Sequence, residues 1–344
     1  MNNKTDVKEQ IQLPKVSILL TPAMRAQILS PEAEQELSSI ASVIAPRGQT
    51  LTVEELPTLV DGAVACVTGW GTPPLSDELL ASYPGLRLVA HTAGTVRRLV
   101  SLSTIEKGLR LSHAAAIIAD SVAEFVISQA LLCLRQLHEI DRDMKAGRAW
   151  NTIRDLYPGR LLGSKTVGVV GTGRVGQAVI RLLVAFGCRV LAHDPYLTAE
   201  QAAQLTVESV SLNELLVRSD IVTLHAPVLP ETTGMIGASQ LALLHEHAIF
   251  INAARSALVD EDALLNTLQK KRIVAALDVF NKEPLPLDSP FRTLPNVILS
   301  PHAAGHTIDT HLRQGQAMVD EVRRFLRGEP LRYEITASTY SILA

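Results

Sequence analysis

Short apolar runs alternate with helical patterns along the whole chain. β-Branched or apolar runs of a few residues predict strands, and apolar positions at helical spacing predict the helices between them. In the first third, strands are expected at 16–20, 62–68, 86–92 and 109–114, and helices at 31–45, 76–82 and 103–107. Residues 1–14 are expected to be a disordered lead-in. Strands that alternate with helices indicate an α/β fold with a parallel sheet.

A second strand–helix series begins near Thr166 and runs further than the first. The expected strands are 167–171, 189–193, 207–210, 221–225, 248–252, 273–279 and 297–300, and the expected helices are 175–186, 198–204, 211–217, 239–244 and 260–270. A helix at 307–327 and a strand at 331–335 follow. The two series predict two domains, and the end of the chain is expected to return to the first.

A long helix is predicted between the two series, over 120–146, followed by an irregular segment at 148–165. A helix of that length rises about 40 Å, which is longer than one compact domain needs. We therefore expect this region either to cross between domains or to pack on a second subunit.

The segment TVGVVGTGRVGQAVIRLLVAFGCRVLAHD, at 166–194, predicts a dinucleotide-binding βαβ unit. Gly171 would make the tight turn, Gly173 would let a pyrophosphate approach the backbone, and Gly176 would let the helix pack on the strand. The helix N-terminus offers N–H groups and a positive dipole end to the phosphates.

An acidic residue stands where the ribose of a dinucleotide would lie. Asp194 ends the second strand of this unit, eighteen residues after Gly176. Its carboxylate could accept hydrogen bonds from both ribose hydroxyls and would repel a 2′-phosphate. The segment His193-Asp194-Pro195-Tyr196 supplies no cation for such a phosphate, so the sequence favours NAD over NADP.

Three further strands of the second series are followed by side chains that suit keto-acid chemistry: Arg255, Glu283 and His302. Ligands of doubly wound sheets bind beyond the carboxyl ends of the strands. Arg255 could hold a substrate carboxylate, and His302 could exchange a proton with the carbonyl oxygen. Glu283, if paired with His302, would favour the imidazolium and fix its orientation. Taken singly, Arg255 is more simply explained as a surface charge, Glu283 as a turn residue and His302 as a structural histidine, and only their shared position at strand ends favours a site.

Composition narrows the class of protein. The 344 residues are 47% apolar and 19% charged, with a net charge of −3, which gives no electrostatic case for nucleic acid or an acidic membrane. Cys66, Cys133 and Cys188 lie in apolar runs and are expected to be buried thiols, with no metal site. The longest apolar stretch, Val122–Leu134, contains polar residues and is too short to span a bilayer. With no apolar signal segment at its start, the chain is expected to be cytoplasmic.

Several segments in order resemble the D-isomer-specific 2-hydroxyacid dehydrogenase family, which includes phosphoglycerate and glycerate dehydrogenases. They are VAEFVISQALLCLRQ, LLGSKTVGVVGTGRVGQAV, LVRSDIVTLHAPVLPETTGMIG, INAARSALVDEDAL, AALDVFNKEPLPLDSP and LPNVILSPHAAG. The resemblance implies two Rossmann-like domains of α/β class, each with a doubly wound parallel sheet. It implies a split, flavodoxin-like substrate domain at 1–114 and 306–344, with an NAD domain inserted at 115–305. It also implies a homodimer.

The resemblance carries roles onto individual residues. Arg255 falls on the family's substrate-binding arginine, Glu283 on its carboxylate partner and His302 on its acid/base histidine. The turn that holds the substrate carboxylate falls on Ala93, Gly94 and Thr95. The residues implied to contact the cofactor, which is NAD, are Thr95, Gly171, Gly173, Arg174, Val175, Gly176, Asp194, Ala226, Ala253, Ala254, Asp278 and Gly305. Among these, Asp278 would receive the nicotinamide carboxamide.

Two departures from the family pattern leave the substrate open. The chain has Thr95-Val96-Arg97-Arg98 where the family commonly continues Gly-Val-Asp-Asn, so Arg97 or Arg98 would either meet a second negative group or be solvated. Ser256 replaces a glycine and would be strained if that position needed a positive φ. Phosphoglycerate, glycerate or hydroxypyruvate, formate and simple D-hydroxy acids all remain candidate substrates. The alternative function is an NAD(H)-sensing regulator or corepressor-like protein of the same fold.

Overall fold

The computed structural model describes residues 13–270 and 272–340, and the chain divides into two compact units. One unit holds the described residues up to 115 and those from 311 onward, and the other holds residues 116–310. The expected boundaries, at 114/115 and 305/306, lie one and five residues from these, and the roles given to the two domains remain predictions. The expected lead-in lies outside the described residues, apart from Leu13 and Pro14.

The first unit is built on a six-stranded sheet in the order β13-β5-β4-β3-β1-β2. The strands are β1 (Lys15–Leu19), β2 (Ser42–Ile44), β3 (Ala63–Thr68), β4 (Leu88–His91), β5 (Arg110–His113) and β13 (Glu334–Ile335). All neighbours are parallel except β13, which is antiparallel to β5. The helices are α1 (Pro22–Ile28), α2 (Pro31–Ile40), α3 (Leu56–Val60), α4 (Asp77–Ser82), α5 (Leu102–Glu106), α14 (Ile308–Leu326) and α15 (Ala337–Tyr340).

The second unit is built on a seven-stranded parallel sheet in the order β12-β11-β10-β9-β6-β7-β8. Its strands are β6 (Thr166–Val170), β7 (Arg189–His193), β8 (Glu208–Ser209), β9 (Ile221–Leu224), β10 (Ile249–Asn252), β11 (Val274–Leu277) and β12 (Val297–Leu299). Its helices are α6 (Ala115–Arg135), α7 (Leu137–Lys145), α8 (Trp150–Leu156), α9 (Arg174–Ala185), α10 (Ala199–Leu205), α11 (Leu212–Arg218), α12 (Ala238–Leu241) and α13 (Glu261–Gln269).

Alternate residues of the second sheet enter two separate cores. Ile249 and Ile251 join one apolar cluster with residues of α6 and α9, whereas Phe250 between them joins another with residues of α11 and α13. A parallel sheet covered by helices on both faces is the doubly wound arrangement. The predicted α/β class with two such sheets is confirmed.

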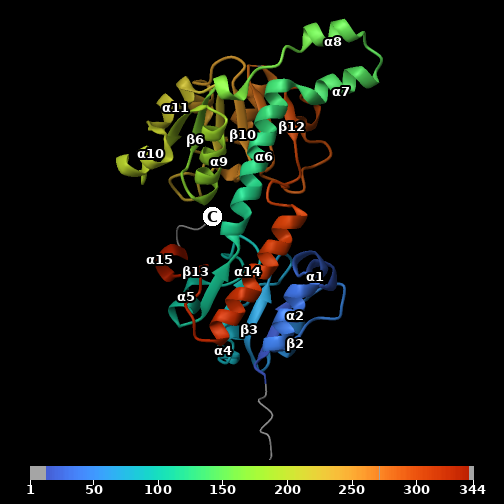
Figure 1. Ribbon diagram of the computed structural model, residues 1–344, viewed down its shortest axis with the longest axis vertical. Coiled ribbons are helices and arrows are strands. Elements are labelled where there is room, and N and C mark those ends of the chain that lie inside the picture. Colours follow the sequence, from blue (N-terminus) through green and yellow to red (C-terminus); the bar gives the residue numbers. More distant parts are fainter. Residues whose placement is uncertain (1–12, 271, 341–344) are drawn as a thin grey trace, which may run out of the picture. The chain divides into compact units, whose positions relative to one another are not determined.

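Two predicted helices are wrong in their length. The helix expected over 120–146 is two helices, because Gln136 takes a left-handed conformation (φ 50°) between α6 and α7. The helix expected over 31–45 ends at Ile40, and residues 42–44 form β2, where the β-branched Val43 and Ile44 favour a strand. Figure 1 shows α7 and α8 extending away from the sheet of the second unit.

Helix α6 is also longer than the apolar stretch from which no membrane span was expected. Its 21 residues are long and apolar enough to cross a membrane by length and composition, although half of this apolar stretch is buried in the fold. Ala123, Val126 and Ile127 pack in the core of the second unit, and a core helix meets the same criteria. Length and hydropathy here are weak evidence for a membrane.

The three cysteines are free thiols. Burial raises the pKa of Cys66 and Cys133 to about 12. Cys188 is only half-buried, contrary to expectation, and burial also raises its pKa. Thiols with raised pKa are poor nucleophiles at neutral pH.

Candidate active site

The turn after β6 requires glycine at two positions. Gly171 has a φ of +93°, and a Cβ there would lie 2.6 Å from the backbone nitrogen of Ala226. A Cβ on Gly176 would lie 2.1 Å from the carbonyl oxygen of Gly171. A side chain at either position would therefore force the turn away from β9 or the helix away from the turn.

The third glycine of this turn has open space in front of it. A Cβ on Gly173 would meet nothing within 4 Å. Helix α9 begins at the next residue, so the N–H groups of Arg174, Val175 and Gly176 belong to its first turn, where an α-helix has no acceptor of its own. Open space before a helix N-terminus fits the pyrophosphate of a dinucleotide.

Asp194 lies beside this turn, directly after β7. Its Oδ2 accepts hydrogen bonds from the backbone N–H of Thr172 (2.7 Å) and from the Thr172 hydroxyl (2.9 Å), and its Oδ1 accepts one from the N–H of Tyr196 (2.9 Å). The carboxylate is therefore fixed at the strand tip, where a ribose would need it. Thr172 was missed by the sequence analysis because the spacing of the glycines specifies no residue type at this position.

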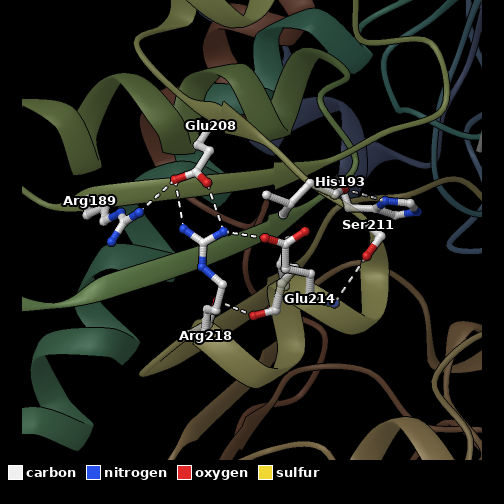
Figure 2. Close-up of polar contacts among 9 residues, drawn as sticks. Arg189, His193, Glu208, Ser211, Glu214 and Arg218 are labelled. Carbon is white, nitrogen blue, oxygen red and sulfur yellow. Dashed lines mark hydrogen bonds and ion pairs between the residues drawn. The ribbon is translucent and has the colours of Figure 1, made fainter.

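The arginines near β7 form ion pairs with glutamates (Figure 2). Arg189 begins β7, at the opposite end from Asp194, and donates to Glu208 at 2.8 Å. Arg218 also donates to Glu208, at 2.8 Å, and pairs with Glu214. The hydrogen bonds from Arg218 and Arg189 lower the pKa of Glu208 to about 2. These cations hold the edge strand β8 and do not serve a phosphate at Asp194.

The turn His225-Ala226-Pro227 follows β9 and packs against the glycine turn. Ala226, expected to contact the cofactor, is 9% exposed and packs against Gly171. Beside it, Nε2 of His225 lies 2.9 Å from the hydroxyl of Thr223. Burial lowers the pKa of His225 to about 3, so the imidazole is neutral at pH 7.

The turn after β10 places Ala253, Ala254 and Arg255. Ala253 is buried, and Ala254 donates its N–H to the Oδ1 of Asn252 at 3.1 Å. The Asn252 amide donates in turn to the carbonyl of Arg255 at 3.1 Å. Asn252, which the sequence analysis missed, thus fixes this turn, and its place as the last residue of a strand was the available signal.

Arg255, Glu283 and His302 come from the ends of three neighbouring strands, β10, β11 and β12. Nδ1 of His302 lies 2.8 Å from Oε2 of Glu283, and Oε1 of Glu283 accepts the N–H of Phe280 at 3.0 Å. The charge of Arg255 acts on the same carboxylate. The sheet therefore brings together the three side chains that the sequence analysis selected.

The electrostatics of this cluster favour ionised partners. Burial acts to raise the pKa of Glu283, but hydrogen bonds from His302 and Phe280 and the charges of His302 and Arg255 outweigh it, and the pKa lies below its usual value. Burial lowers the pKa of Arg255, against the effect of Glu283, and an arginine stays charged regardless. A carboxylate between an imidazole and a guanidinium can stabilise positive charge on the imidazole.

His302 has a left-handed backbone (φ 54°) and is held by Asp278. The carbonyl of Asp278 accepts the N–H of His302 at 2.8 Å. Its carboxylate, 1% exposed, accepts hydrogen bonds from the Ser300 hydroxyl (2.6 Å) and the N–H groups of Ala303 (2.8 Å) and Ala304 (2.9 Å). Asp278 therefore fixes the turn that presents His302, and its expected contact with a carboxamide remains a prediction.

Two other positions can be compared with their expected roles. Ser256 starts a short 3₁₀ helix, Ser256–Leu258, and is not among the described non-glycine residues with positive φ, so the strain considered for it does not arise. A Cβ on Gly305 would lie 2.8 Å from Ile118, so this glycine allows close packing on α6. Its expected contact with the cofactor remains a prediction.

The expected carboxylate-binding turn belongs to the first unit and follows β4. Ala93 is buried, Gly94 is half-buried and Thr95 is exposed. Arg97 and Arg98 are also exposed. Within residues 13–270 and 272–340, no group of three or more His, Cys, Asp or Glu side chains is arranged to bind a metal ion.

Comparisons with known proteins point to one family. Residues 127–304 match the profile of the NAD binding domain of D-isomer specific 2-hydroxyacid dehydrogenases. The chain is 36% identical to D-3-phosphoglycerate dehydrogenase of Methanocaldococcus jannaschii over 81% of this chain and 53% of that protein. It is 34% identical to glyoxylate reductase of Korarchaeum cryptofilum over 75% of this chain and 78% of that protein.

A solved structure agrees with these sequence matches. The crystal structure of TT0316 protein from Thermus thermophilus resembles this chain with a TM-score of 0.80 and 30% identity, covering 94% of this chain and all of that one. The chain spans about half the length of the phosphoglycerate dehydrogenases that it matches, at 53% and 47%.

Proposed function

The chain belongs to the D-isomer specific 2-hydroxyacid dehydrogenase family, and on this premise we propose that it is an NAD-dependent oxidoreductase that interconverts a small D-2-hydroxy acid and its 2-keto acid. The observation that carries the proposal is the cluster of Arg255, Glu283 and His302 on the sheet that also carries the glycine turn. A guanidinium, a carboxylate and an imidazole are the groups that this reaction needs.

The proposed cofactor is NAD. The open space at Gly173 and the first-turn N–H groups of α9 suit a pyrophosphate, and Asp194 at the tip of β7 suits unphosphorylated ribose hydroxyls. Arg189 and Arg218 are both paired with Glu208, which supports NAD over NADP. When bound, the reduced nicotinamide supplies a hydride for the carbonyl carbon.

The side chains of the cluster divide the remaining work. Arg255 would hold the substrate carboxylate with a charge-assisted fork and so orient the carbonyl. His302 would give a proton to the carbonyl oxygen in reduction and take it back in oxidation. Glu283, 2.8 Å from Nδ1, would orient the ring and stabilise its positive charge.

The turn of Ala93, Gly94 and Thr95 is proposed to bind the substrate carboxylate through backbone N–H groups. Relatives named for phosphoglycerate and for glyoxylate are 36% and 34% identical to this chain, so a small 2-keto acid is the substrate class we propose. The exposed Arg97 and Arg98 would suit a substrate with a second negative group.

We also propose a homodimer formed through residues 137–161, here called the α7–α8 arm, in a cytoplasmic protein. The arm carries exposed large apolar side chains on residues Leu137, Met144, Trp150, Leu156 and Leu161. It is held in shape by Asp143, which accepts hydrogen bonds from Arg148 and from the hydroxyl of Tyr157, each at 2.8 Å. A shaped arm with an apolar surface suits a second copy of the chain.

The deciding experiment is a screen of the purified protein for NADH consumption with a panel of 2-keto acids, including glyoxylate, hydroxypyruvate and pyruvate. We expect turnover with at least one of them, and a higher kcat/KM with NADH than with NADPH. If NADH binds and no acid is reduced, the protein is not an enzyme of this class, and the regulatory alternative gains support.

A further inference from the structure

The carboxyl edge of the first sheet ends in a row of polar residues that the proposed chemistry does not use. Thr68, His91 and His113 are the last residues of β3, β4 and β5, and they lie in register with one another. Their exposures are 0%, 4% and 3%. Ligands of doubly wound sheets bind beyond this edge, so buried polar groups here are candidates for a functional role.

Both imidazoles hydrogen-bond the turn that follows β4. Nδ1 of His113 lies 2.9 Å from the carbonyl oxygen of Gly94. The ring of His91 hydrogen-bonds the backbone of Thr95, and its Nδ1 lies 3.0 Å from the hydroxyl of Thr68. The Thr95 hydrogen bond raises the pKa of His91, so its partner is the carbonyl of Thr95 and the ring is the donor. A carbonyl can only accept, so each ring donates an N–H to the turn.

The histidines are suited to this task because they are buried close together. Burial and the neighbouring His113 lower the pKa of His91 to about 4, against the effect of the Thr95 hydrogen bond. A neutral imidazole has one donor and one acceptor nitrogen. In His91 the donor faces Thr95, and the acceptor is satisfied by the hydroxyl of Thr68.

These contacts determine which way the peptide groups of the turn face. In a trans peptide the C=O and the following N–H point in opposite directions. With the carbonyls of Gly94 and Thr95 held by the imidazoles, the N–H groups of Thr95 and Val96 face away from the sheet. Successive N–H groups on one side of a turn form a concave site for an anion.

We infer that His91 and His113 are positioning residues that orient the N–H groups of Thr95 and Val96 toward the carboxylate of the substrate. This inference rests on the proposed function, since it assigns the ligand as a 2-keto acid. The histidines themselves do not touch the substrate, and they act through the backbone of the turn.

The test compares His113→Leu, which removes the donor, with His113→Asn, whose amide nitrogen can occupy the position of Nδ1. We expect His113→Leu to raise KM for the keto acid about tenfold, with a smaller change in kcat, because ground-state and transition-state binding weaken together. The Kd of NADH, measured by fluorescence, stays unchanged. His113→Asn restores most of the affinity. If His113→Leu does not fold, His113→Gln, whose amide lies one carbon further out, replaces it.

Ser112→Ala is the matched control, because Ser112 is equally buried on β5 but donates to Glu321 at 2.6 Å and not to the turn. A wild-type KM in His113→Leu, or an equal rise in Ser112→Ala, would overturn the inference. If the wild-type protein reduces no 2-keto acid, the proposed function fails. Backbone ¹H–¹⁵N chemical shifts then decide the positioning role: changed shifts at residues 95 and 96 in His113→Leu, with wild-type shifts in Ser112→Ala, support it, and unchanged shifts in His113→Leu overturn it.

Discussion

The two sheets use histidine in opposite ways at their carboxyl edges. In the second unit, the His302 side chain is 50% exposed and pairs with the carboxylate of Glu283. In the first unit, His91 and His113 are 4% and 3% exposed and hydrogen-bond backbone carbonyls. Water and a carboxylate favour a histidine that can gain a charge, whereas burial favours a neutral one. Burial and partners, more than residue type, therefore separate an acid/base group from a structural donor.

The backbone differs between the two edges as well. His91 and His113 end regular strands, whereas His302 stands in a turn with a φ of 54°. Non-glycine residues in this region are held by their surroundings, and they cluster at functional sites. Around His302, four hydrogen bonds to Asp278 provide that support. The second edge holds the proposed acid/base histidine in a strained backbone conformation, whereas the histidines of the first edge hold a turn from regular strands.

The largest expected effect is the loss of the proton donor. His302→Ala should lower kcat by roughly 10²–10⁴, since general acid catalysis contributes about that much. NADH binding should survive, as measured by fluorescence titration. His247→Ala is the matched control, because His247 is exposed and also has a positive φ (66°) but lies outside the cluster. Near-normal turnover in His302→Ala would assign the proton to another group and remove the contrast between the two edges.

Arg255→Ala should weaken substrate binding by a few kcal/mol, about 10²-fold in kcat/KM, as loss of a charge-assisted contact does. Arg255→Lys should fall between the two, because lysine keeps the charge and loses the fork. Steady-state kinetics with the acid found in the screen measure both. An unchanged KM and kcat in Arg255→Ala would exclude this residue from the site.

The sequence was sufficient for the features that depend on strand ends. The parallel strands, the glycine turn and the three residues of the cluster follow from periodicity and from the rule that strand tips share one edge. The break at Gln136 could not be predicted, because glutamine favours helix and residues other than glycine rarely take a left-handed conformation. Helix α3 escaped notice because it has only five residues, too few for a periodic signal.

The contacts of the residues that support the site could not be predicted from the sequence either. Asp278 was expected to contact the cofactor, and its hydrogen bonds to the 300–304 turn depend on how that turn folds back. The pairing of His91 with His113 needs the register between β4 and β5, which local patterns do not specify. Strand-tip residues are visible in a sequence, whereas the residues that hold them require the packed structure.

Acid should lower the free energy of unfolding because His91 is buried and neutral in the folded protein, and a variant can separate this contribution from others. Above about pH 6.5, His91 is neutral in both the folded and the unfolded chain. As the pH falls, the unfolded chain binds the proton first, since the folded pKa is about 4. The free energy of unfolding should therefore fall by about 3 kcal/mol between pH 6.5 and 4 from His91 alone. His225, with a pKa of about 3, adds to the loss in the second unit.

Urea unfolding at pH 7 and pH 4.5 measures this loss, with His91→Gln as the comparison because glutamine does not titrate. We expect His91→Gln to be less stable than the wild type at pH 7 and to lose less stability on acidification. If both proteins lost the same free energy of unfolding on acidification, His91 would be charged in the folded state. The contrast between a buried neutral His91 and an exposed His302 would then be wrong.

The smallest expected effect comes from removing the negative charge beside His302, which leaves this histidine with a neutral partner like those of His91 and His113. Glu283→Gln keeps an acceptor near Nδ1 of His302 and removes the charge that stabilises the imidazolium, so kcat should fall about tenfold at pH 7. Glu261→Gln is the matched control, because Glu261 accepts the N–H of Asn281 at 2.8 Å in the same region without touching His302. If Glu283→Gln retains full activity, the carboxylate only orients the ring, and exposure alone distinguishes His302 from the buried pair.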